Sequence, residues 1–451
     1  MRACWFSVAV VVASFFVWPG AGALSAAQTT SALRVQTAGE PQRVRGSDGR
    51  EHIEYDLVIT NSFSARTRLR SLEVRAGGRR LLSLSGAKLG AATLGLATFA
   101  STGPSVAPGF TVVIPVDLAL PRSAGRSVPG ALANRITYTI PGHPPLRAVI
   151  GSTTVDMPPV RVDRRAPVVI ASPLRGSGWL NANGCCDDPT SPHRHTVLAT
   201  STGGYVTPEV FAIDWSRIVK GVLFTGDGSK NSDYPTFGSP LYAVANGTVV
   251  RAVDGMPDIP PRTQNPFLRT PYDFGGNRVL LRIGPGRYAC YAHIKEGSVR
   301  VRVGQHVRVN QRIGLVGNSG NTTLPHLHFG IQRRPDCLSA SEPFEIDRFK
   351  LQGMADPTSV PPHIKIVRKP RRERRSLPLI RSVATFSLSD PPRGSSFLQR
   401  AVAQRLGVIE AISHWASTAF GLLRPDPNAL NPWTRIADLR PQPPLRQRFA
   451  G

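Results

Sequence analysis

Residues 325–329 read PHLHF, and this short stretch is the most informative part of the chain. If it forms a β-strand, alternate side chains point to opposite faces, so His326 and His328 share one face. Leu327 and Phe329 would then share the other face and enter a core. The stretch therefore predicts a buried strand that presents two imidazoles to a functional site.

Two further predicted strands carry candidate site residues. Asp214 stands in the apolar run FAIDW at 211–215, where an isolated buried carboxylate is costly unless it is paired or binds a cation. His293 stands in YAHI at 291–294. Two imidazoles and one carboxylate around an open fourth position are the ligand set of a hydrolytic zinc site. A lone His-x-His pair means little, but its combination with these residues predicts a Zn²⁺ centre.

The run from residue 211 to 331 resembles the lysostaphin/LytM-type zinc metalloendopeptidases of bacterial cell walls. The matching motifs occur in family order: AIDW at 212–215, GSPLYAVANGTV at 238–249, YAHI at 291–294, GQ at 304–305, GNSGN at 317–321 and PHLHF at 325–329. The resemblance implies an antiparallel β-sheet peptidase domain and the hydrolysis of peptide bonds in cell-wall peptidoglycan by zinc-activated water.

The resemblance also assigns roles to individual residues. Asp214 and His328 would be metal ligands. His326 would be the catalytic histidine that handles the proton of the attacking water. His293 would be a second catalytic histidine at the reacting centre. The resemblance, and not these roles, implies that peptidoglycan peptide is the substrate.

One position departs from the family pattern. The first ligand of the family stands four residues before the aspartate, and this chain has Val210 there, which cannot bind a metal. We expect His193 to supply the third ligand, with His195 as the alternative. If neither does, the chain would be a catalytically degenerate LytM-like module that binds the cell wall or regulates another hydrolase.

The amino terminus predicts export. An apolar stretch at 3–17 precedes AGA at 21–23, the small-residue pattern that signal peptidase cleaves. We expect residues 1–23 to be a signal peptide and the mature protein, without a membrane span, to be secreted or periplasmic and associated with the cell envelope.

The charge balance indicates the partners. The chain has 55 Lys and Arg against 29 Asp and Glu, a formal net charge of +26, which favours anionic cell-envelope polymers. Export, and the lack of aromatic stacking motifs among the Arg clusters, argue against nucleic acid.

The overall pattern predicts a mainly β chain. Short alternating strands at 32–150 predict an immunoglobulin-like β-sandwich, similar to the accessory domain that often precedes such peptidases. Residues 151–192 predict a linker and 193–349 the LytM-type peptidase domain. Residues 350–451 predict a basic, Pro-rich tail with an amphipathic helix near 396–423.

Two histidines of the predicted sandwich, His52 and His143, are expected to be solvated strand or turn residues. The mature chain keeps four cysteines, and an even number in an oxidising compartment permits disulfides in three possible pairings. The sequence leaves the pairing open, since the adjacent pair could join each other or reach distant partners: Cys185, Cys186, Cys290 and Cys337.

Overall fold

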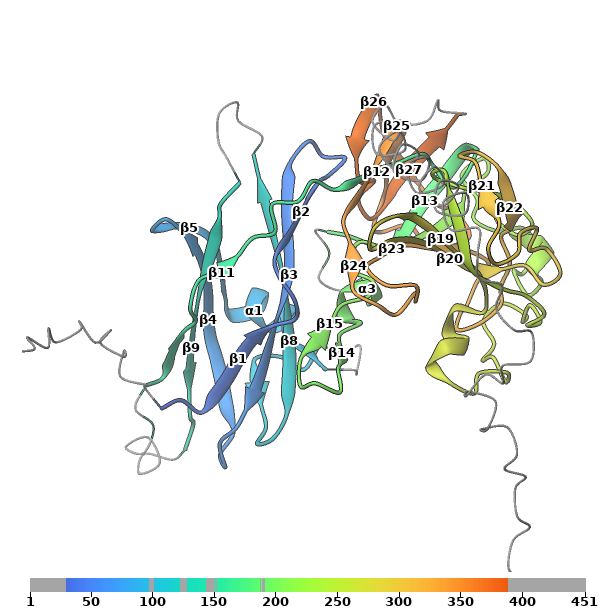
Figure 1. The fold of residues 1–451 in the computed structure, drawn as a ribbon. Coiled ribbons are helices and arrows are strands. Elements are labelled where there is room, and N and C mark those ends of the chain that lie inside the picture. Colours follow the sequence, from blue (N-terminus) through green and yellow to red (C-terminus); the bar gives the residue numbers. More distant parts are fainter. Residues whose placement is uncertain are drawn as a thin grey trace, which may run out of the picture. The chain divides into compact units, whose positions relative to one another are not determined.

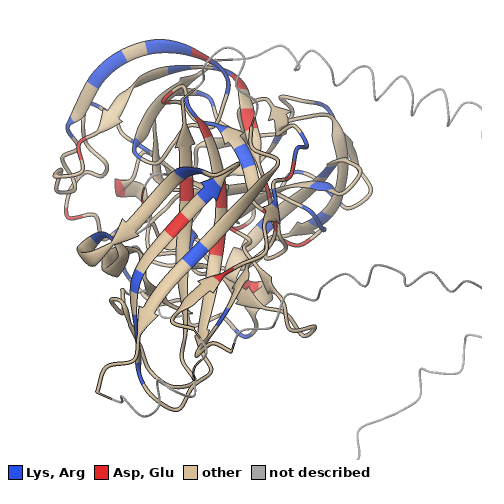
Figure 2. Ribbon diagram, turned by 90° about the vertical axis from the view of Figure 1, so that its left-hand side faces the viewer, with Lys and Arg blue, Asp and Glu red and all other residues tan. Residues whose placement is uncertain are grey.

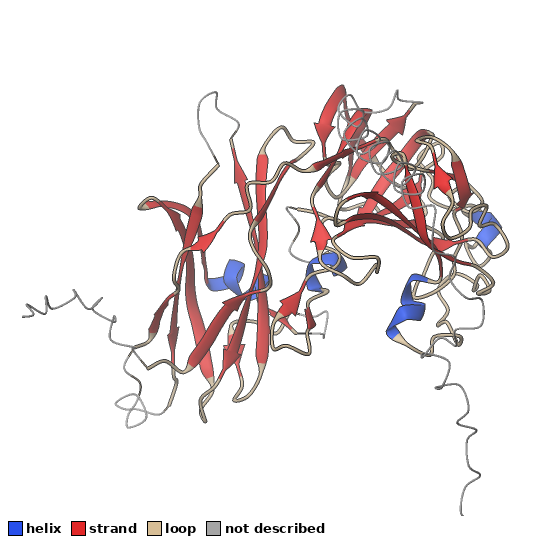
Figure 3. Cartoon of the chain, viewed as in Figure 1, coloured by secondary structure: helices blue, strands red, loops and turns tan. Residues whose placement is uncertain are grey.

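The structure, a computed structural model, describes residues 30–387 except 97–100, 122–127, 143–149, 151, 187 and 189–190. The predicted signal peptide, His143 and the predicted helix near 396–423 lie outside the described residues. The prediction of a mainly β chain is confirmed, because strands in several antiparallel sheets dominate the described residues (Figure 3). No helix among them is long and apolar enough to cross a membrane.

Two sheets form the amino-terminal part of the described chain (Figure 1). The first pairs β1 (Leu33–Thr37), β2 (Gln42–Arg45), β3 (Glu51–Asn61), β6 (Leu94–Gly95) and β8 (Thr111–Leu120). The second pairs β4 (Thr67–Ala76), β5 (Arg79–Ser85), β7 (Ser105–Val106), β9 (Ala131–Thr139), β10 (Thr154–Asp156) and β11 (Val160–Arg161), and helix α1 (Gly86–Ala92) follows β5. Buried side chains of both sheets share one core, so the sheets pack face to face.

Strand β3 is buried on both of its faces. Its odd-numbered side chains enter the sandwich core: Ile53, Tyr55, Leu57 and Ile59. Its even-numbered side chains His52, Glu54 and Asp56 are also buried, although the outer face of a sandwich strand usually meets water. The expectation that His52 is solvated was therefore wrong. Alternation shows which side chains face outward, but it does not show that a later chain segment covers them.

A larger sheet of 12 strands follows in the described chain. Its strands, in chain order, are β12 (Val168–Ile170), β13 (Gly176–Asn183), β16 (Ile213–Arg217), β18 (Gly247–Val253), β19 (Asn277–Gly284), β20 (Arg287–Ile294), β21 (His306–Val307), β23 (Leu327–Gln332), β24 (Ser341–Glu342), β25 (Phe344–Ala355), β26 (Ile366–Ser376) and β27 (Ser382–Phe386). In space the main order is β12-β25-β27-β13-β16-β23-β20-β19-β18-β21. The pairing is antiparallel except between β12 and β25.

Short elements complete this part of the chain. Strands β14 (Leu198–Ala199) and β15 (Tyr205–Val206) pair with each other, as do β17 (Pro240–Tyr242) and β22 (Arg312–Leu315). The short helices are α3 (Pro192–His195), η1 (Asn231–Asp233) and η2 (Pro271–Gly275).

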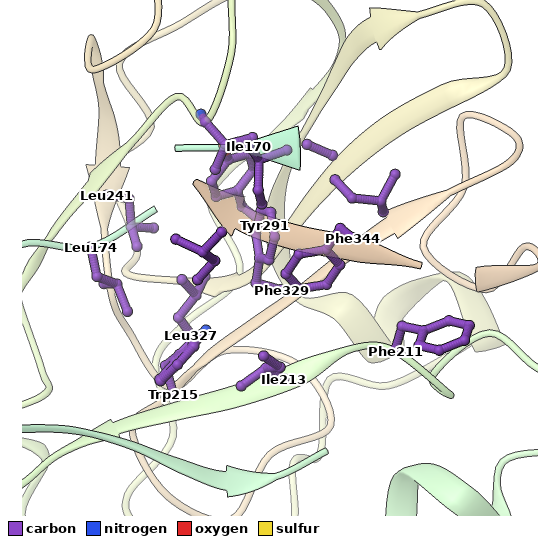
Figure 4. Close-up of a cluster of buried hydrophobic side chains, with 14 of the residues drawn as sticks. Ile170, Leu174, Phe211, Ile213, Trp215, Leu241, Tyr291, Leu327, Phe329 and Phe344 are labelled. Atoms are coloured by element: carbon purple, nitrogen blue, oxygen red, sulfur yellow. The ribbon is translucent and has the colours of Figure 1, made fainter. Parts of the chain in front are cut away.

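The main core lies against the central strands of the large sheet (Figure 4). Ile213 and Trp215 of β16 and Leu327 and Phe329 of β23 are fully buried in it. The Phe329 ring meets the Tyr291 ring edge to face, with 5.1 Å between their centroids, an arrangement that aromatic rings favour. The apolar half of the PHLHF stretch therefore enters a core, as its alternation predicts.

Two segments that the sequence assigned to a linker and a tail hold strands of the large sheet. Strands β12 and β13 lie within 151–192, and β26 and β27 lie within 350–387. Strand β26 pairs only with β25 among the described strands, and Lys and Arg crowd along it (Figure 2). Its run of basic residues gives no hydrophobic alternation, so hydrogen bonding to β25 determines a strand that the local pattern does not indicate. The domain limits themselves stay a prediction.

Both pairs of cysteines are disulfide-bonded. Cys185 is joined to its neighbour Cys186, and Cys290 in β20 is joined to Cys337 after β23. Among the pairings that the sequence leaves open, the structure therefore has the adjacent one. In the sequence, the Cys185–Cys186 pair lies between β13 and α3.

Candidate metal centre

The register of two central strands brings the first two candidate ligands together. Strands β16 and β23 are antiparallel, and Asp214 is directly opposite His328. Directly opposite residues present their side chains on the same face of a sheet, so both point away from the core that Leu327 and Phe329 enter. The Nδ1 atom of His328 lies 2.9 Å from Oδ1 of Asp214.

The third candidate, His193, comes from helix α3. Its Nε2 lies 3.1 Å from Oδ2 of Asp214. Its Nδ1 lies 3.0 Å from the backbone carbonyl oxygen of Ala212. Because a carbonyl oxygen only accepts, Nδ1 carries a hydrogen and donates it, so Nε2 is the nitrogen that faces the site and could bind a metal ion in place of its proton. His193 is buried, and its ring meets the His328 ring edge to face.

These donors fit a metal ion. One donor atom from each of His193, Asp214 and His328 lies within 4.8 Å of the other two. Two imidazole nitrogens and one carboxylate oxygen are the donor set that catalytic zinc uses when a further position stays open. The tautomer of His193 and the direction of the carboxylate are both fixed by further hydrogen bonds, as is usual for ligands of a metal site.

One of those supporting residues escaped the sequence analysis. The Asn183 side chain donates from Nδ2 to Oδ2 of Asp214 at 3.0 Å, and its Oδ1 accepts from the Ser191 hydroxyl. Asn183 ends β13 and pairs with Asp214 across β13 and β16. An asparagine in a predicted linker carries no signal of this role, because only the strand pairing places it beside the carboxylate.

The geometry favours His193 over Val210 and His195 as the third metal ligand. Val210 is buried in the main core. His195 is not among the described residues that cluster with Asp214, and its charge acts instead on Asp56 of β3. The structure thus brings together the donor set with His193 that the sequence analysis favoured.

The two predicted catalytic histidines stand beside these donors. The Nε2 atom of His326 lies 3.4 Å from Oδ1 of Asp214, the oxygen that His328 also approaches. The two histidines of the PHLHF stretch therefore reach one carboxylate from one face, as their spacing predicts. The His293 ring lies 4.6 Å from the His326 ring, centroid to centroid.

Backbone carbonyls hold the remaining nitrogens of this pair. Nδ1 of His326 donates to the Leu324 carbonyl oxygen at 2.7 Å, and Nδ1 of His293 donates to that of Ser319 at 2.7 Å. His293 also has a backbone φ of 59°, in the left-handed region that non-glycine residues rarely occupy. Residues in such conformations cluster at functional sites, where the surrounding structure must hold them.

Burial and neighbouring charges shift the pKa values of the ionisable groups of the site in different directions. Burial acts to raise the pKa of Asp214, but the charges of His193 and His326 outweigh it and hold this pKa well below its ordinary value. Burial acts to lower the pKa of His193, and Asp214 raises it to about 9. Asp214 likewise raises the pKa of His326 against burial. Burial, followed by the charges of His326 and His328, lowers the pKa of His293 well below its ordinary value.

Comparison with known proteins identifies part of this region. Residues 230–340 match the sequence model of Peptidase family M23. The matched stretch holds His293, His326 and His328 and begins downstream of His193 and Asp214. Peptidase family M23 consists of zinc-dependent peptidoglycan endopeptidases, and its cell-wall hydrolases act at the cell envelope.

Three known proteins share parts of the chain. The cell division protein DipM of Caulobacter vibrioides is 26% identical over 155 residues, 34% of this chain and 22% of DipM. The peptidoglycan DD-endopeptidase ShyA of Vibrio cholerae is 34% identical over 92 residues, 20% of this chain and 17% of ShyA. The match to the lysostaphin catalytic domain from Staphylococcus simulans, at 23% identity, covers 28% of this chain and 88% of that domain with a TM-score of 0.18.

The extent of these matches limits what they identify. This chain spans less than a quarter of the length of either curated relative in the matched regions. The structural likeness has a low TM-score, so the assignment rests on the sequence match, which includes the PHLHF stretch. Over residues 230–340, the chain therefore carries a domain of peptidase family M23.

Proposed function

We propose that the chain is a zinc metalloendopeptidase that hydrolyses peptide bonds of cell-wall peptidoglycan. The observation that carries this proposal is the convergence of His193, Asp214 and His328 within 4.8 Å, beside two further imidazoles. When bound, zinc supplies a Lewis acid that lowers the pKa of water and polarises a peptide carbonyl. The M23 domain supports peptidoglycan peptide as the substrate.

Three residues of the chain would bind the ion, and a fourth would orient one of them. His193, Asp214 and His328 would hold the metal. Asn183 would keep the carboxylate in place through its hydrogen bond to Oδ2. All of these groups are buried or half-buried, so the surrounding protein limits how many water molecules compete for the ion.

His326 and His293 would move the proton. In each ring Nδ1 is occupied by a carbonyl oxygen, so Nε2 is the nitrogen that exchanges a proton with the reacting groups. We assign His326 as the residue that takes the proton of the attacking water and returns it to the leaving amine. His293, whose ring lies beside His326, would assist that transfer or stabilise the developing oxyanion.

The rest of the chain fits a protein of the cell envelope. We propose that the chain is exported by residues 1–23, that its sandwich is immunoglobulin-like, and that it acts while secreted or periplasmic. Its net charge of +26 and the exposed basic strand β26 would attract anionic cell-envelope polymers. Such attraction should weaken as salt screens the charges.

Peptidoglycan digestion tests the proposal directly. The purified mature protein should release new amino groups from peptidoglycan, lose this activity with a chelator, and regain it when Zn²⁺ is restored. The variant His328→Ala should release none. Undiminished release by His328→Ala would refute the proposed centre.

Val210 supports a second candidate function. If the departure at this position means that the ligand is lost, the domain would bind the wall or regulate another hydrolase without a metal. That function predicts wall binding with no stoichiometric zinc in elemental analysis. About one zinc per chain, with His193 required for it, would exclude this alternative.

A further inference from the structure

His193 is the candidate ligand that the large sheet does not place by strand register. Asp214 and His328 stand on paired strands, whereas His193 stands on α3, a helix of four residues. So short a helix has no stability of its own, because nucleation costs more than its first hydrogen bond returns. The position of His193 therefore depends on what the side chains around it contact.

The residue next to His193 is anchored in the amino-terminal sandwich. The Arg194 side chain is 1% exposed, and its Nη2 lies 3.1 Å from Oε2 of Glu54 and 3.3 Å from Oδ1 of Asp56. The same nitrogen donates to the carbonyl oxygen of Tyr55 at 3.4 Å. A guanidinium stays charged at any physiological pH, so it can be buried only beside such partners. All three partners belong to β3.

A second contact joins the same segment to the same sheet. Val197, two residues beyond α3, packs with Val58 of β3 and Val113 of β8. Figure 1 shows α3 next to β8, and residues of the two elements are in contact. The segment thus covers the outer face of the sandwich, which explains why the even-numbered side chains of β3 are buried.

We propose that the amino-terminal sandwich has a function in the metal centre: Glu54 and Asp56 hold Arg194, and through it they position His193 for zinc. This inference rests on the proposed function. Arg194 is a positioning residue, because it acts through its neighbour. Consecutive Cα atoms are about 3.8 Å apart, so a shift of Arg194 moves His193 with it.

The large sheet holds His193 from the opposite side. The Ala212 carbonyl oxygen fixes the ring, and Oδ1 of Asn183 accepts from the backbone N–H of His193 at 3.5 Å. Loss of the sandwich anchor should therefore weaken the site without abolishing it. Removal of residues that orient metal ligands typically costs 10- to 100-fold in metal affinity, and we expect an effect of that size.

Zinc affinity of the full chain tests this proposal. The double variant E54Q/D56N replaces both carboxyl groups with amides and keeps the shape of both side chains. The matched control is Glu51→Gln, which removes a charge from the same strand, where Glu51 pairs with Arg43. Competition with a chromophoric chelator should give Zn²⁺ affinity about 10- to 100-fold lower for E54Q/D56N and near wild type for the control.

Arg194 itself gives a second, milder test. Arg194→Met should lower Zn²⁺ affinity as the double variant does. Arg194→Lys should recover part of it, because one charged nitrogen meets both carboxylates. Substitution of Co²⁺ for zinc should show the altered ligand set in the visible spectrum. If the double variant does not fold, this pair decides the question.

The outcomes separate this proposal from the proposed function. Wild-type Zn²⁺ affinity in folded E54Q/D56N, or in folded Arg194→Met, would overturn the positioning role. A wild-type chain that binds zinc through His193 but does not cut peptidoglycan would overturn the proposed function and leave the positioning role standing. Affinity that is unchanged by His193→Ala would overturn the positioning role and the assignment of His193 as a ligand.

Discussion

The proposed metal centre takes its donors from two differently constructed regions. Asp214 and His328 stand on β16 and β23, where strand register fixes both backbones and the main core lies behind them. His193 stands on α3, which is held by side chains from β3 on one side and from β13 on the other. A donor fixed by register depends on the sheet alone, whereas a donor on a short helix depends on every group that contacts it.

If His193 is the third ligand, as we propose, the site keeps its chemistry while one donor moves. Val210 occupies the position of the family's first ligand and packs into the core. His193 reaches the same carboxylate from 17 residues upstream of Val210, across the end of β13. The cost of the change is that the donor needs an anchor outside the sheet, and the sandwich offers one.

The largest expected effect is on the register-held donors. His328→Ala should lose stoichiometric zinc and all peptidoglycan hydrolysis, because two remaining donors bind zinc weakly. Elemental analysis after dialysis measures the first effect and release of amino groups the second. His306→Ala serves as the control, since His306 lies exposed on β21. About one zinc per chain in His328→Ala would contradict the assignment.

A direct comparison of two neighbours tests the helix-held donor. His193→Ala should lower Zn²⁺ affinity by at least about 100-fold, since a ligand is removed rather than reoriented. His195→Ala should have a much smaller effect, because His195 is not among the described residues whose donor atoms converge with Asp214. Chelator competition on both variants measures the two affinities. The opposite ranking would make His195 the ligand.

The same difference explains what the sequence could predict. The PHLHF stretch and the apolar run around Asp214 have a period of two, so both strands, their core faces and the same-side histidines follow from local pattern. His193 could be proposed because the family pattern lacked a donor at Val210. Asn183 and Arg194 could not, since their roles depend on pairing between distant segments, and neither residue type marks a metal site.

The prediction that the outer face of β3 meets water was wrong for the same reason. His52, Glu54 and Asp56 alternate with apolar residues as the outer face of a sandwich strand does. The pattern is identical whether water or another segment covers the face. Only the position of Arg194 and Val197 in space shows that the face is covered.

The proton-transfer residues should affect rate and leave the metal in place. His326→Ala should lower the rate of hydrolysis by about 10²- to 10⁴-fold, the usual contribution of a general acid or base. His293→Ala should act in the same direction. Zinc content should stay near one per chain in both variants. A loss of zinc as complete as in His328→Ala would make His326 a metal ligand, in addition to Asp214 and His328.

The smallest expected effect is on the stability of the fold, and it comes from His52 in the amino-terminal sandwich. His52 is buried and hydrogen-bonds through Nδ1 to Asp117 of β8 and through Nε2 to Asp48. Its Nδ1 also lies 4.0 Å from Oε1 of Glu54. Burial acts to lower the pKa of His52, but Asp117 and Asp48 raise it to about 10. A raised pKa stabilises the fold fully below about pH 6.5, and this stability is lost as pH rises toward 10.

The melting temperature of the full chain should therefore fall between pH 7.5 and 10, by an amount that reflects up to a few kcal/mol. His52→Asn should flatten this decline, because the titrating group is gone. Glu345, whose burial raises its pKa to about 7, titrates mainly below this range and is present in both proteins, so it cancels from their difference. His193, with its pKa of about 9, is present in both proteins, so the difference between the two curves reports His52 together with Glu54, Asp48 and Asp117, whose pKa values depend on it. Parallel curves would show that the cluster around Arg194 does not depend on a charged His52, and the anchor would then rest on Glu54 and Asp56 alone.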